Sequence, residues 1–436
     1  IARIGPNDLL TISPEVLMQM NTVRLPYVRG EWYNGATRIE AGKDHIFSLL
    51  DENMHLKRRQ QLAPGYSGKE NLSLEPAIDG RVRELVQLIR SRYISTTSQS
   101  KPMDLGRKFQ YFALDVISLI GFGQSFGHLK IDADVGDFIN ATEAAFPGIT
   151  LMVAFNSLRI VTQWLPLARL LGPSEKDKTG IGKMATFRRL VDERLTTPTN
   201  TRSDMMASFI RHRLSNEQVF TEAFLQIIAG SDTTATALRC LMLYLISHPR
   251  VYRKLQVEVA HAVESGLVQD SDAIISEAQA KTLPYLNAVI REGMRMHPPV
   301  TNIVPKVVPK EGDTFHINGQ NVFIPGGTNI GYCVLGLNRS RALFGDDVDH
   351  FRPERWLIEG DKNSASRLDA MKRTTDMIFG YGKYQCLDKP IVWMEVNKMM
   401  RHFDWAIECP EKPWTSTDYI GVFMQRNMWV TVTKRE

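Results

Sequence analysis

Cysteine and long apolar runs are scarce in this sequence. The chain of 436 residues holds four cysteines, and no two of them stand in a Cys-x-x-Cys pair. That pattern excludes a disulfide scaffold and favours a reducing compartment or one special thiolate. No stretch approaches the roughly 18 consecutive apolar residues of a membrane-spanning helix. The sequence therefore predicts no such helix within it.

Charge of one sign is not concentrated anywhere either. The formal net charge is +5, and basic and acidic residues are spread along the chain. A nucleic-acid footprint needs a basic patch or stripe, so we expect no nucleic-acid partner. Repeats, low-complexity runs and Gly/Ser linkers are absent as well, which favours one domain spanning residues 1–436.

What the sequence does contain is mostly helical periodicity, from about residue 50 to about residue 300. Short strand-like segments stand at 1–25, at about 300–330 and in the tail "GVFMQRNMWVTVTK". This pattern predicts a mainly α fold with a minor β region. In "SPEVLMQM" we expect a short helix with Ser13 as N-cap and Pro14 at its first position.

One expected helix, from Asn216 to Ser247, interrupts its apolar sequence with the polar insert "GSDTT". At 1.5 Å per residue it would be roughly 45 Å long, enough to cross a domain. A glycine followed by two threonines is unfavourable in mid-helix, and threonine hydroxyls can bond back to carbonyls. Such a weakness in a buried helix marks a candidate functional site.

The stretch "FGYGKYQCLDKP" places Cys386 behind Gly380 and Gly382, and ahead of a helix-like segment after Pro390. The glycines allow a tight turn and close approach to a flat ligand. A thiolate at a helix N-terminus is stabilised by the free amides and the helix dipole. A lone cysteine is more often a buried structural residue, but the glycine frame favours a functional one.

Three further polar patterns are weak when each is taken alone. Glu292 and Arg295 share one helical face, and a surface ion pair is the simpler interpretation. Arg355 in "FRPERW" could belong to an ordinary polar turn. His55 and Arg59 are four residues apart, so they could present two donors to one anionic target or form a solvated basic face.

Taken together and in this order, the motifs resemble those of the cytochrome P-450 family of haem-thiolate proteins, along the whole chain. "FGYGKYQC" is similar to the family's haem-binding loop, and "AGSDTT" to its oxygen-activating helix. Glu292, Arg295 and Arg355 match the family's buried Glu-x-x-Arg network. "FGYGKYQCL" and "RPERWL" most resemble eukaryotic microsomal members, in particular fungal enzymes of secondary metabolism such as pisatin demethylase.

The resemblance implies a haem b group (heme b, iron protoporphyrin IX) between the long central helix and the cysteine loop, with Cys386 as the metal ligand. It implies that Asp232 and Thr233 deliver protons to dioxygen. The expected cofactor-binding residues are His55, Arg59, Lys306, Phe379, Gly380, Gly382 and Cys386. The expected walls of an apolar substrate pocket are Trp32, Tyr33, Gln226, Ala229, Val300, Ile303, Val422 and Phe423.

Three positions depart from the family's pattern. Tyr384 stands where an arginine is usual, and Lys306 where a propionate-binding arginine is usual, so two bidentate donors are replaced. Haem retention is therefore expected to depend more on His55 and Arg59. Asp388 stands where a glycine is usual, and we expect its carboxylate to face solvent and to favour the start of the next helix.

The implied function is a monooxygenase that inserts one oxygen atom of O2 into a lipophilic small molecule, such as a fungal terpenoid or polyketide. Electrons would come from an NADPH-cytochrome reductase. The resemblance also implies a monomer of the endoplasmic reticulum membrane, facing the cytosol. An N-terminal membrane helix, missing from this chain, would anchor the full-length protein, and the chain without it is expected to be soluble.

Two other functions use the same cofactor. One is a haem-thiolate isomerase, dehydratase or coupling enzyme, which the Asp232–Thr233 pair disfavours because the pair has no clear use without oxygen activation. The other is a non-catalytic haem-binding sensor or carrier, which the apolar pocket walls disfavour. A zinc enzyme or cysteine hydrolase would need a second ligand or a placed histidine, and the sequence offers neither.

Overall fold

The computed structural model describes residues 1–22, 26–33, 38, 42–71, 73–155, 182–196, 203–268, 274–301, 305–317, 319–357, 362–392, 403–419 and 421–434. The predicted pocket residue Ile303 lies outside these ranges. So does most of the helix expected after Pro390, of which residues 389–392 are described as helical.

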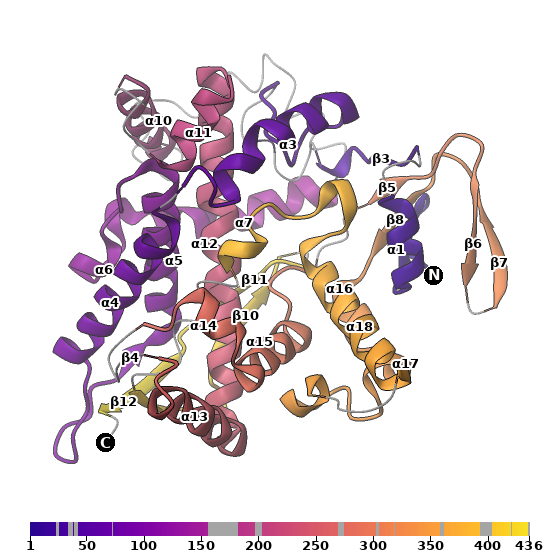
Figure 1. The fold of residues 1–436 in the computed structure, drawn as a ribbon. Helices are drawn as coiled ribbons and strands as arrows, with labels where there is room; N and C mark the ends of the chain where they lie inside the picture. The colour runs from indigo at the N-terminus through magenta and orange to yellow at the C-terminus, as the bar shows by residue number, and fades with distance from the viewer. Residues whose placement is uncertain are drawn as a thin grey trace.

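Helices make up most of the described chain and confirm the predicted mainly α class (Figure 1). They are α1 (Pro14–Met20), α3 (Glu52–Tyr66), α4 (Leu74–Arg92), α5 (Leu105–Phe122), α6 (His128–Ile131), α7 (Phe138–Ala154), α10 (Gly182–Leu195), α11 (Met205–Arg211), α12 (Asn216–Ser247), α13 (Pro249–Glu264), α14 (Glu277–Lys281), α15 (Pro284–Met296), α16 (Val334–Leu337), α17 (Arg341–Phe344) and α18 (Lys362–Asp376). Short 3₁₀ turns are η1 (Val135–Asp137), η2 (Pro353–Trp356), η3 (Met377–Phe379) and η4 (Gly382–Tyr384).

The strands are short and form small sheets, as the sequence predicts. They are β1 (Ala2–Arg3), β2 (Asp8–Thr11), β3 (Val28–Arg29), β4 (Met103–Asp104), β5 (Lys306–Val307), β6 (Asp313–Ile317), β7 (Gln320–Ile324), β8 (Asn329–Tyr332), β9 (Phe403–Ile407), β10 (Thr415–Asp418), β11 (Phe423–Arg426) and β12 (Trp429–Lys434). One sheet has the order β1-β2-β8-β5-β3, and a second has the order β4-β12-β9. The pairs β6–β7 and β10–β11 form two hairpins.

Helix α12 is the central element of the fold. It runs through the middle of the molecule, with α4, α5 and α6 on one side and the sheet that contains β5 and β8 on the other (Figure 1). Its apolar residues pack against α5 in the largest buried cluster, which includes Phe112, Ile117 and Leu238. A central, buried α12 is what positions the "AGSDTT" motif in the interior.

Local signals explain where α12 and α1 begin and end. Ser215 and Gln218 form a capping box at the start of α12, and Pro249 follows its end at His248. Ser13 caps α1 by accepting a hydrogen bond from the backbone N–H of Val16, and Pro14 occupies the first turn. Both predicted helices therefore have the bounds that their capping residues indicate.

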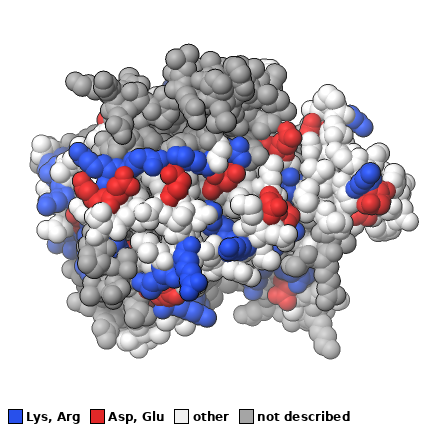
Figure 2. Space-filling model, turned by 90° about the horizontal axis from the view of Figure 1, so that it is seen from above, with Lys and Arg blue, Asp and Glu red and all other residues white. Residues whose placement is uncertain are grey.

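The surface carries charges of both signs. On the face seen in Figure 2, Lys and Arg side chains lie beside Asp and Glu side chains, and neither kind covers the face alone. Among the described helices, none is both long and apolar enough to cross a membrane.

Candidate haem-thiolate site

The cysteine loop has a tight, hydrogen-bonded backbone. The amide of Cys386 donates to the carbonyl of Phe379 at 2.7 Å, which closes the loop around its two glycines. Gly380 and Gly382 both have positive φ, at 75° and 63°. A β-carbon on Gly382 would stand 2.4 Å from the carbonyl oxygen of Asn21, at the end of α1. Glycine is therefore required at 382 for both its conformation and its close approach.

Cys386 has exposed surface in this loop, and protein atoms also lie close around its sulfur. The backbone N–H of Asp388 donates to its sulfur at 3.4 Å. Burial, followed by the nearby Asp388 carboxyl, raises the pKa of the thiol to about 12, against the smaller opposing effects of backbone N–H groups and Arg59. The amides at the helix start thus do not by themselves produce a thiolate. A coordinated metal ion would deprotonate the thiol outright.

A group of basic side chains lies beside this loop, and we call it the basic cluster: Arg29, His55, Arg59, Lys306 and Lys383. After burial, the four other members are the charges that lower the pKa of His55 to about 3. Glu52 is the acid that the structure pairs with the cluster, through Lys383 at 2.9 Å. Among the described residues this one carboxylate faces five basic side chains, of which Arg29, His55 and Lys306 are buried, so the cluster favours an anionic ligand.

His55 and Arg59, predicted as two donors to one anion, have different roles in the structure. The Arg29 Nη2 group lies 2.8 Å from His55 Nε2. Because a guanidinium can only donate, Nε2 accepts, and the neutral His55 ring keeps one donor, Nδ1–H. Arg59 Nη1 donates to the carbonyl of Gln385 at 2.6 Å, which ties α3 to the residue before Cys386.

Lys306 lies deep in the same cluster. It is 2% exposed, and its Nζ has no hydrogen-bond partner among the described residues. The Nζ lies 2.9 Å from the centroid of the Tyr384 ring and 5.4 Å from that of Tyr33. Burial, followed by the Arg29 charge, lowers the pKa of Lys306 well below its usual range. Tyr33, expected in the substrate pocket, is thus buried against the basic cluster instead.

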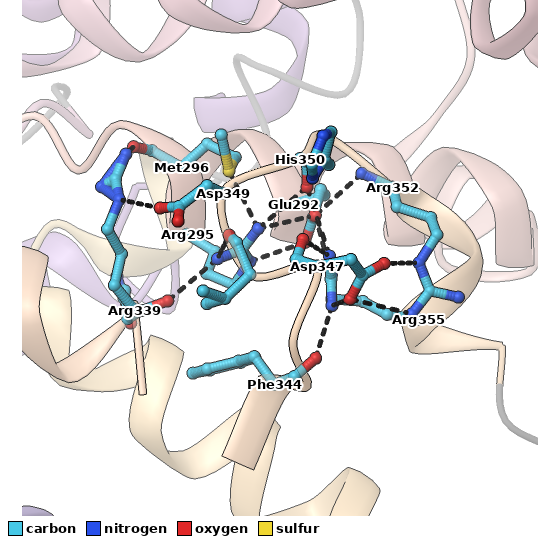
Figure 3. A network of polar contacts seen from close by, with 12 residues as sticks. Glu292, Arg295, Met296, Arg339, Phe344, Asp347, Asp349, His350, Arg352 and Arg355 are labelled. Carbon is cyan, nitrogen blue, oxygen red and sulfur yellow. Dashed lines mark hydrogen bonds and ion pairs between the residues drawn. The ribbon is translucent and has the colours of Figure 1, made fainter. Parts of the chain in front are cut away.

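Glu292, Arg295 and Arg355 meet in one fully buried network (Figure 3). Glu292 accepts from Arg295 Nε at 2.9 Å and Nη2 at 2.8 Å, and from Arg355 Nε at 2.8 Å. It also accepts from the indole of Trp356 at 2.9 Å. The network joins α15 to η2, because every donor named here comes from one of those two elements.

Asp232 and Thr233 lie within the unbroken helix α12. The Thr233 hydroxyl donates to the carbonyl of Ala229 at 2.7 Å, as expected for a mid-helix threonine. The Asp232 carboxylate lies 4.0 Å from Nη1 of Arg239. Nη2 of the same guanidinium donates a hydrogen bond to Oε1 of Gln110 on α5. Burial raises the pKa of Asp232, and Arg239 opposes that rise. The carboxyl therefore holds its proton more readily than an exposed one.

The prediction that Asp388 faces solvent is wrong. Its Oδ2 lies 3.4 Å from where a β-carbon on Gly230 of α12 would stand, and its Oδ1 is buried without a partner among the described residues. Burial raises the pKa of the Asp388 carboxyl to about 7. The carboxyl thus points toward α12 and not into solvent, because the backbone of Gly230 leaves room for it there.

The predicted pocket segments meet in part. Val300 and Val422 form an antiparallel bridge, and β11, which begins at Phe423, contacts α12. Ala229 on α12 is exposed, and Trp32 is partly buried beside Tyr33. Gln226 differs from the prediction: it is 4% exposed, and its Nε2 donates to the sulfur of Met205 at 2.6 Å. Gln226 therefore belongs to the packing between α12 and α11.

Sequence reasoning missed Arg29. It lies on β3 directly opposite Lys306 on β5, since these two residues are paired in the sheet. Its guanidinium is buried, and Nε has no partner among the described residues. No local motif marks Arg29, because only long-range strand pairing brings it to the cysteine loop.

These residues fit a haem group. Haem offers an iron atom that takes an axial cysteine thiolate, and carboxylates that need basic partners. The chain supplies Cys386 on a loop shaped by two glycines. Beside it lie two buried nitrogens, Arg29 Nε and Lys306 Nζ, for which the described part of the chain offers no hydrogen-bond partner. The fold and the site together thus define a haem-thiolate protein.

Comparison with known proteins specifies the family. The family model described as Cytochrome P450 matches residues 11–427. The Cytochrome P450 monooxygenase ABA1 of Pyricularia oryzae is 39% identical to this chain, over 99% of the chain and 84% of the relative. The Cytochrome P450 monooxygenase aba1 of Botryotinia fuckeliana is 37% identical, over 100% and 84%. The Cytochrome P450 monooxygenase abl1 of Leptosphaeria maculans is 33% identical, over 97% and 74%.

The chain belongs to the cytochrome P450 family. The predicted resemblance, including its fungal character, is confirmed, since these relatives are fungal P450 monooxygenases. The chain is accordingly an oxidoreductase of the cytochrome P450 monooxygenase class.

Proposed function

We propose that this enzyme inserts one oxygen atom of O2 into a lipophilic fungal secondary metabolite, with release of the other atom as water. The observation that carries the proposal is the placement of Cys386, on its glycine-shaped loop, beside a buried basic cluster that favours an anionic cofactor. A thiolate ligand and carboxylate-binding cations are the two features a haem-thiolate enzyme requires of its chain.

The cofactor proposed here is haem b. Cys386 would be its axial ligand, and the backbone of Phe379, Gly380 and Gly382 would shape the loop under it. Arg59 and Lys306 would neutralise its carboxylates. When bound, the haem supplies an iron centre at which dioxygen is reduced and a C–H bond is oxidised, and the thiolate favours O–O cleavage.

Two residues of α12 would handle protons. Each turnover consumes two electrons and two protons, so the site needs a route from solvent to dioxygen. The Thr233 hydroxyl, held by Ala229 at 2.7 Å, can pass a proton on. Asp232 can supply it, because burial raises the pKa of its carboxyl while Arg239 keeps that carboxyl in place.

The substrate would lie over Ala229, between the bridged segments at Val300 and Val422 and the ring of Phe423. These walls are apolar, which suits a lipophilic molecule with few polar groups. Relatives with fungal secondary-metabolism character support a terpenoid or polyketide as the substrate class.

We expect the chain to work as one catalytic domain and as a monomer, with electrons from an NADPH-cytochrome reductase. We also propose that the full-length protein is anchored at the cytosolic face of the endoplasmic reticulum membrane.

The test is spectroscopic and then chemical. The ferrous carbonyl complex of the purified chain should absorb where thiolate-ligated haem absorbs, and Cys386→His should move the band to the position typical of globins. An unchanged band in that variant would show that another residue is the ligand. With a reductase and ¹⁸O₂, one labelled atom should enter the product. Product formed without label would favour the isomerase or dehydratase alternative.

A further inference from the structure

We propose that Glu52, in the first turn of α3, positions the cysteine loop by holding the phenol of Tyr384, two residues before Cys386. The inference rests on the proposed haem-thiolate function. It concerns a residue outside the predicted site, Glu52, and gives Tyr384, which stands where an arginine is usual, a role of its own in this chain.

The hydroxyl of Tyr384 is bound to a carboxylate of the protein itself. It donates to Oε1 of Glu52. Burial, followed by this hydrogen bond, raises the pKa of Tyr384, so the phenol keeps its proton and remains a donor. A hydrogen bond between a hydroxyl and a carboxylate is roughly twice as strong as one between neutral groups. Position 384 therefore links the cysteine loop to α3.

Each of the three residues before Cys386 contacts α3. The phenol uses one oxygen of Glu52, and the Nζ of Lys383 lies 2.9 Å from the other. The carbonyl of Gln385 accepts a hydrogen bond from Nη1 of Arg59 at 2.6 Å. Glu52 provides two of these three contacts, so it is the residue of α3 on which the position of the loop depends most.

The loop needs such contacts because its own backbone is permissive. Gly380 and Gly382 have φ values of 75° and 63°, and glycine leaves the chain many other conformations. The sulfur of Cys386 accepts a hydrogen bond from the backbone N–H of Asp388 at 3.4 Å. Hydrogen bonds to a ligating sulfur tune the electron density that it gives to the metal. A looser loop would weaken this bond, so Glu52 acts on the iron through the position of the loop.

The competing account treats Glu52 only as a negative charge next to the basic cluster. The ring and the hydroxyl of Tyr384 allow the two accounts to be separated. The ring centroid lies 2.9 Å from Nζ of Lys306 and 4.7 Å from the guanidinium carbon of Arg29, so the ring makes both of these contacts. Tyr384→Phe therefore keeps the ring and every charge and removes only the bond to Glu52.

The experiment uses the holoprotein and the variants Tyr384→Phe, Glu52→Ala and the double variant. The ferric/ferrous midpoint potential is measured, together with the rate at which the thiolate band of the ferrous carbonyl complex changes to that of a neutral thiol ligand. We expect Tyr384→Phe to lower the potential, because a weaker N–H bond leaves more electron density on the sulfur. It should also speed the band change about ten- to a hundredfold, the range for one hydrogen bond to a charged group.

Tyr381→Phe is the matched control. It removes a hydroxyl from the same loop, at a residue that is 37% exposed and whose hydroxyl has no hydrogen-bond partner among the described residues. Both quantities should stay at their wild-type values in this variant. Equal shifts in Tyr381→Phe and Tyr384→Phe would overturn the proposal, because they would not depend on the bond to Glu52.

In the Glu52→Ala background, Tyr384→Phe should change neither quantity further, because the acceptor of its hydrogen bond is already gone. A further change there would overturn the proposal, since the hydroxyl would then act through another partner. A wild-type potential in Tyr384→Phe would also overturn it, even in a less stable variant, because lower stability does not alter the potential of the folded fraction. Tyr384→Phe decides the question if Glu52→Ala yields too little protein. Failure of the proposed function has a different signature: the wild-type ferrous carbonyl complex would then lack the thiolate band.

Discussion

At the scale of single residues, Thr233 makes a backbone hydrogen bond and is also the residue that we propose as a proton donor. Its hydroxyl donates to the carbonyl of Ala229 within a helix that has no break from Asn216 to Ser247. The bond holds the oxygen in a fixed place, so the hydroxyl can also serve as a point of proton transfer. Asp232 is oriented separately, by Arg239. The two neighbours can therefore be tested one at a time.

We expect Thr233→Ala to retain haem and substrate binding but to divert electrons from product to hydrogen peroxide. Loss of a positioned proton donor typically reduces the rate by about 10² to 10⁴. The measurement is the ratio of product to NADPH consumed. The control is Thr221→Ala, because Thr221 also bonds back within α12, to the carbonyl of Gln218 at 3.0 Å. Unchanged coupling in Thr233→Ala would exclude this role.

Asp388 leads to a prediction about stability. Its buried Oδ1 has no partner among the described residues, and an unsatisfied buried polar group costs about 1–3 kcal/mol. We expect Asp388→Ala to raise the free energy of unfolding by an amount in that range at pH 8, measured by urea denaturation. A lower stability of this variant at pH 8 would mean that the carboxylate has a stabilising partner.

The same residue gives a pH dependence with a definite sign. Its pKa is about 7 in the folded chain, against an ordinary value of 3.8. The folded state therefore binds more protons between these values, and stability falls as pH rises from about 4 to about 7. The gain from Asp388→Ala should accordingly be larger at pH 8 than at pH 5. Asp388→Asn, which cannot ionise, should abolish this part of the pH dependence.

Residues in contiguous motifs could be predicted, whereas those placed by long-range contacts could not. Cys386 and Thr233 could be proposed as functional residues because each lies in a contiguous motif. The direction of the Asp388 side chain depends on its contact with Gly230 of α12, 158 residues earlier in the sequence, and a local helix-capping argument gave the wrong answer. Arg29 carries no motif, and its position follows from a strand pair with Lys306.

At the scale of elements, the buried network joins α15 to η2. Both Arg295 and Arg355 donate to the Glu292 carboxylate, which is completely buried. The predicted Glu-x-x-Arg spacing explains the Arg295 contact, since three residues place both side chains on one helical face. The contact between Arg355 and Glu292 joins residues 63 positions apart in the sequence, which local spacing does not predict.

We expect Glu292→Gln to yield little folded, haem-loaded protein. The variant leaves two buried guanidinium groups without their carboxylate, and breaking a buried pair costs about 3–5 kcal/mol. The measurement is the amount of haem-containing protein per total protein after expression. Glu354→Gln is the control within η2. Glu354 pairs with Arg250 and Lys254 at the surface, where such pairs contribute about 0–1 kcal/mol. Equal yields of the two variants would contradict the structural role.

The bounds of elements were predictable where a cap defines them. The capping box at Ser215 and the proline at 249 delimit α12, and Ser13 with Pro14 starts α1. The order β1-β2-β8-β5-β3 was not predictable. Its strands have two to four residues each, which is too short for their own sequence to specify which strands pair.

At the scale of the whole molecule, the cysteine loop depends on the N-terminal segment. Gly382 approaches the carbonyl of Asn21, so the end of α1 lies against the loop that carries Cys386. The sequence predicted a glycine turn here because of the haem. The structure adds that the turn must also fit against a segment 361 residues away in the chain.

We therefore expect Gly382→Ala to damage the haem site more than backbone strain alone would. A non-glycine residue in the left-handed region costs about 1–2 kcal/mol, and here the new β-carbon would also stand 2.4 Å from Asn21 O. Gly136→Ala is a matched control, because the φ of Gly136, 61°, is close to the 63° of Gly382 and nothing lies within 4 Å of its β-carbon position.

Thermal unfolding should show a modest loss of stability for Gly136→Ala and a larger one for Gly382→Ala. Only the second variant should also lose part of the thiolate band of its ferrous carbonyl complex, since the clash must move either α1 or the Cys386 loop. Equal losses in the two variants, with the band intact, would mean that the contact between Asn21 and Gly382 does not position the cysteine.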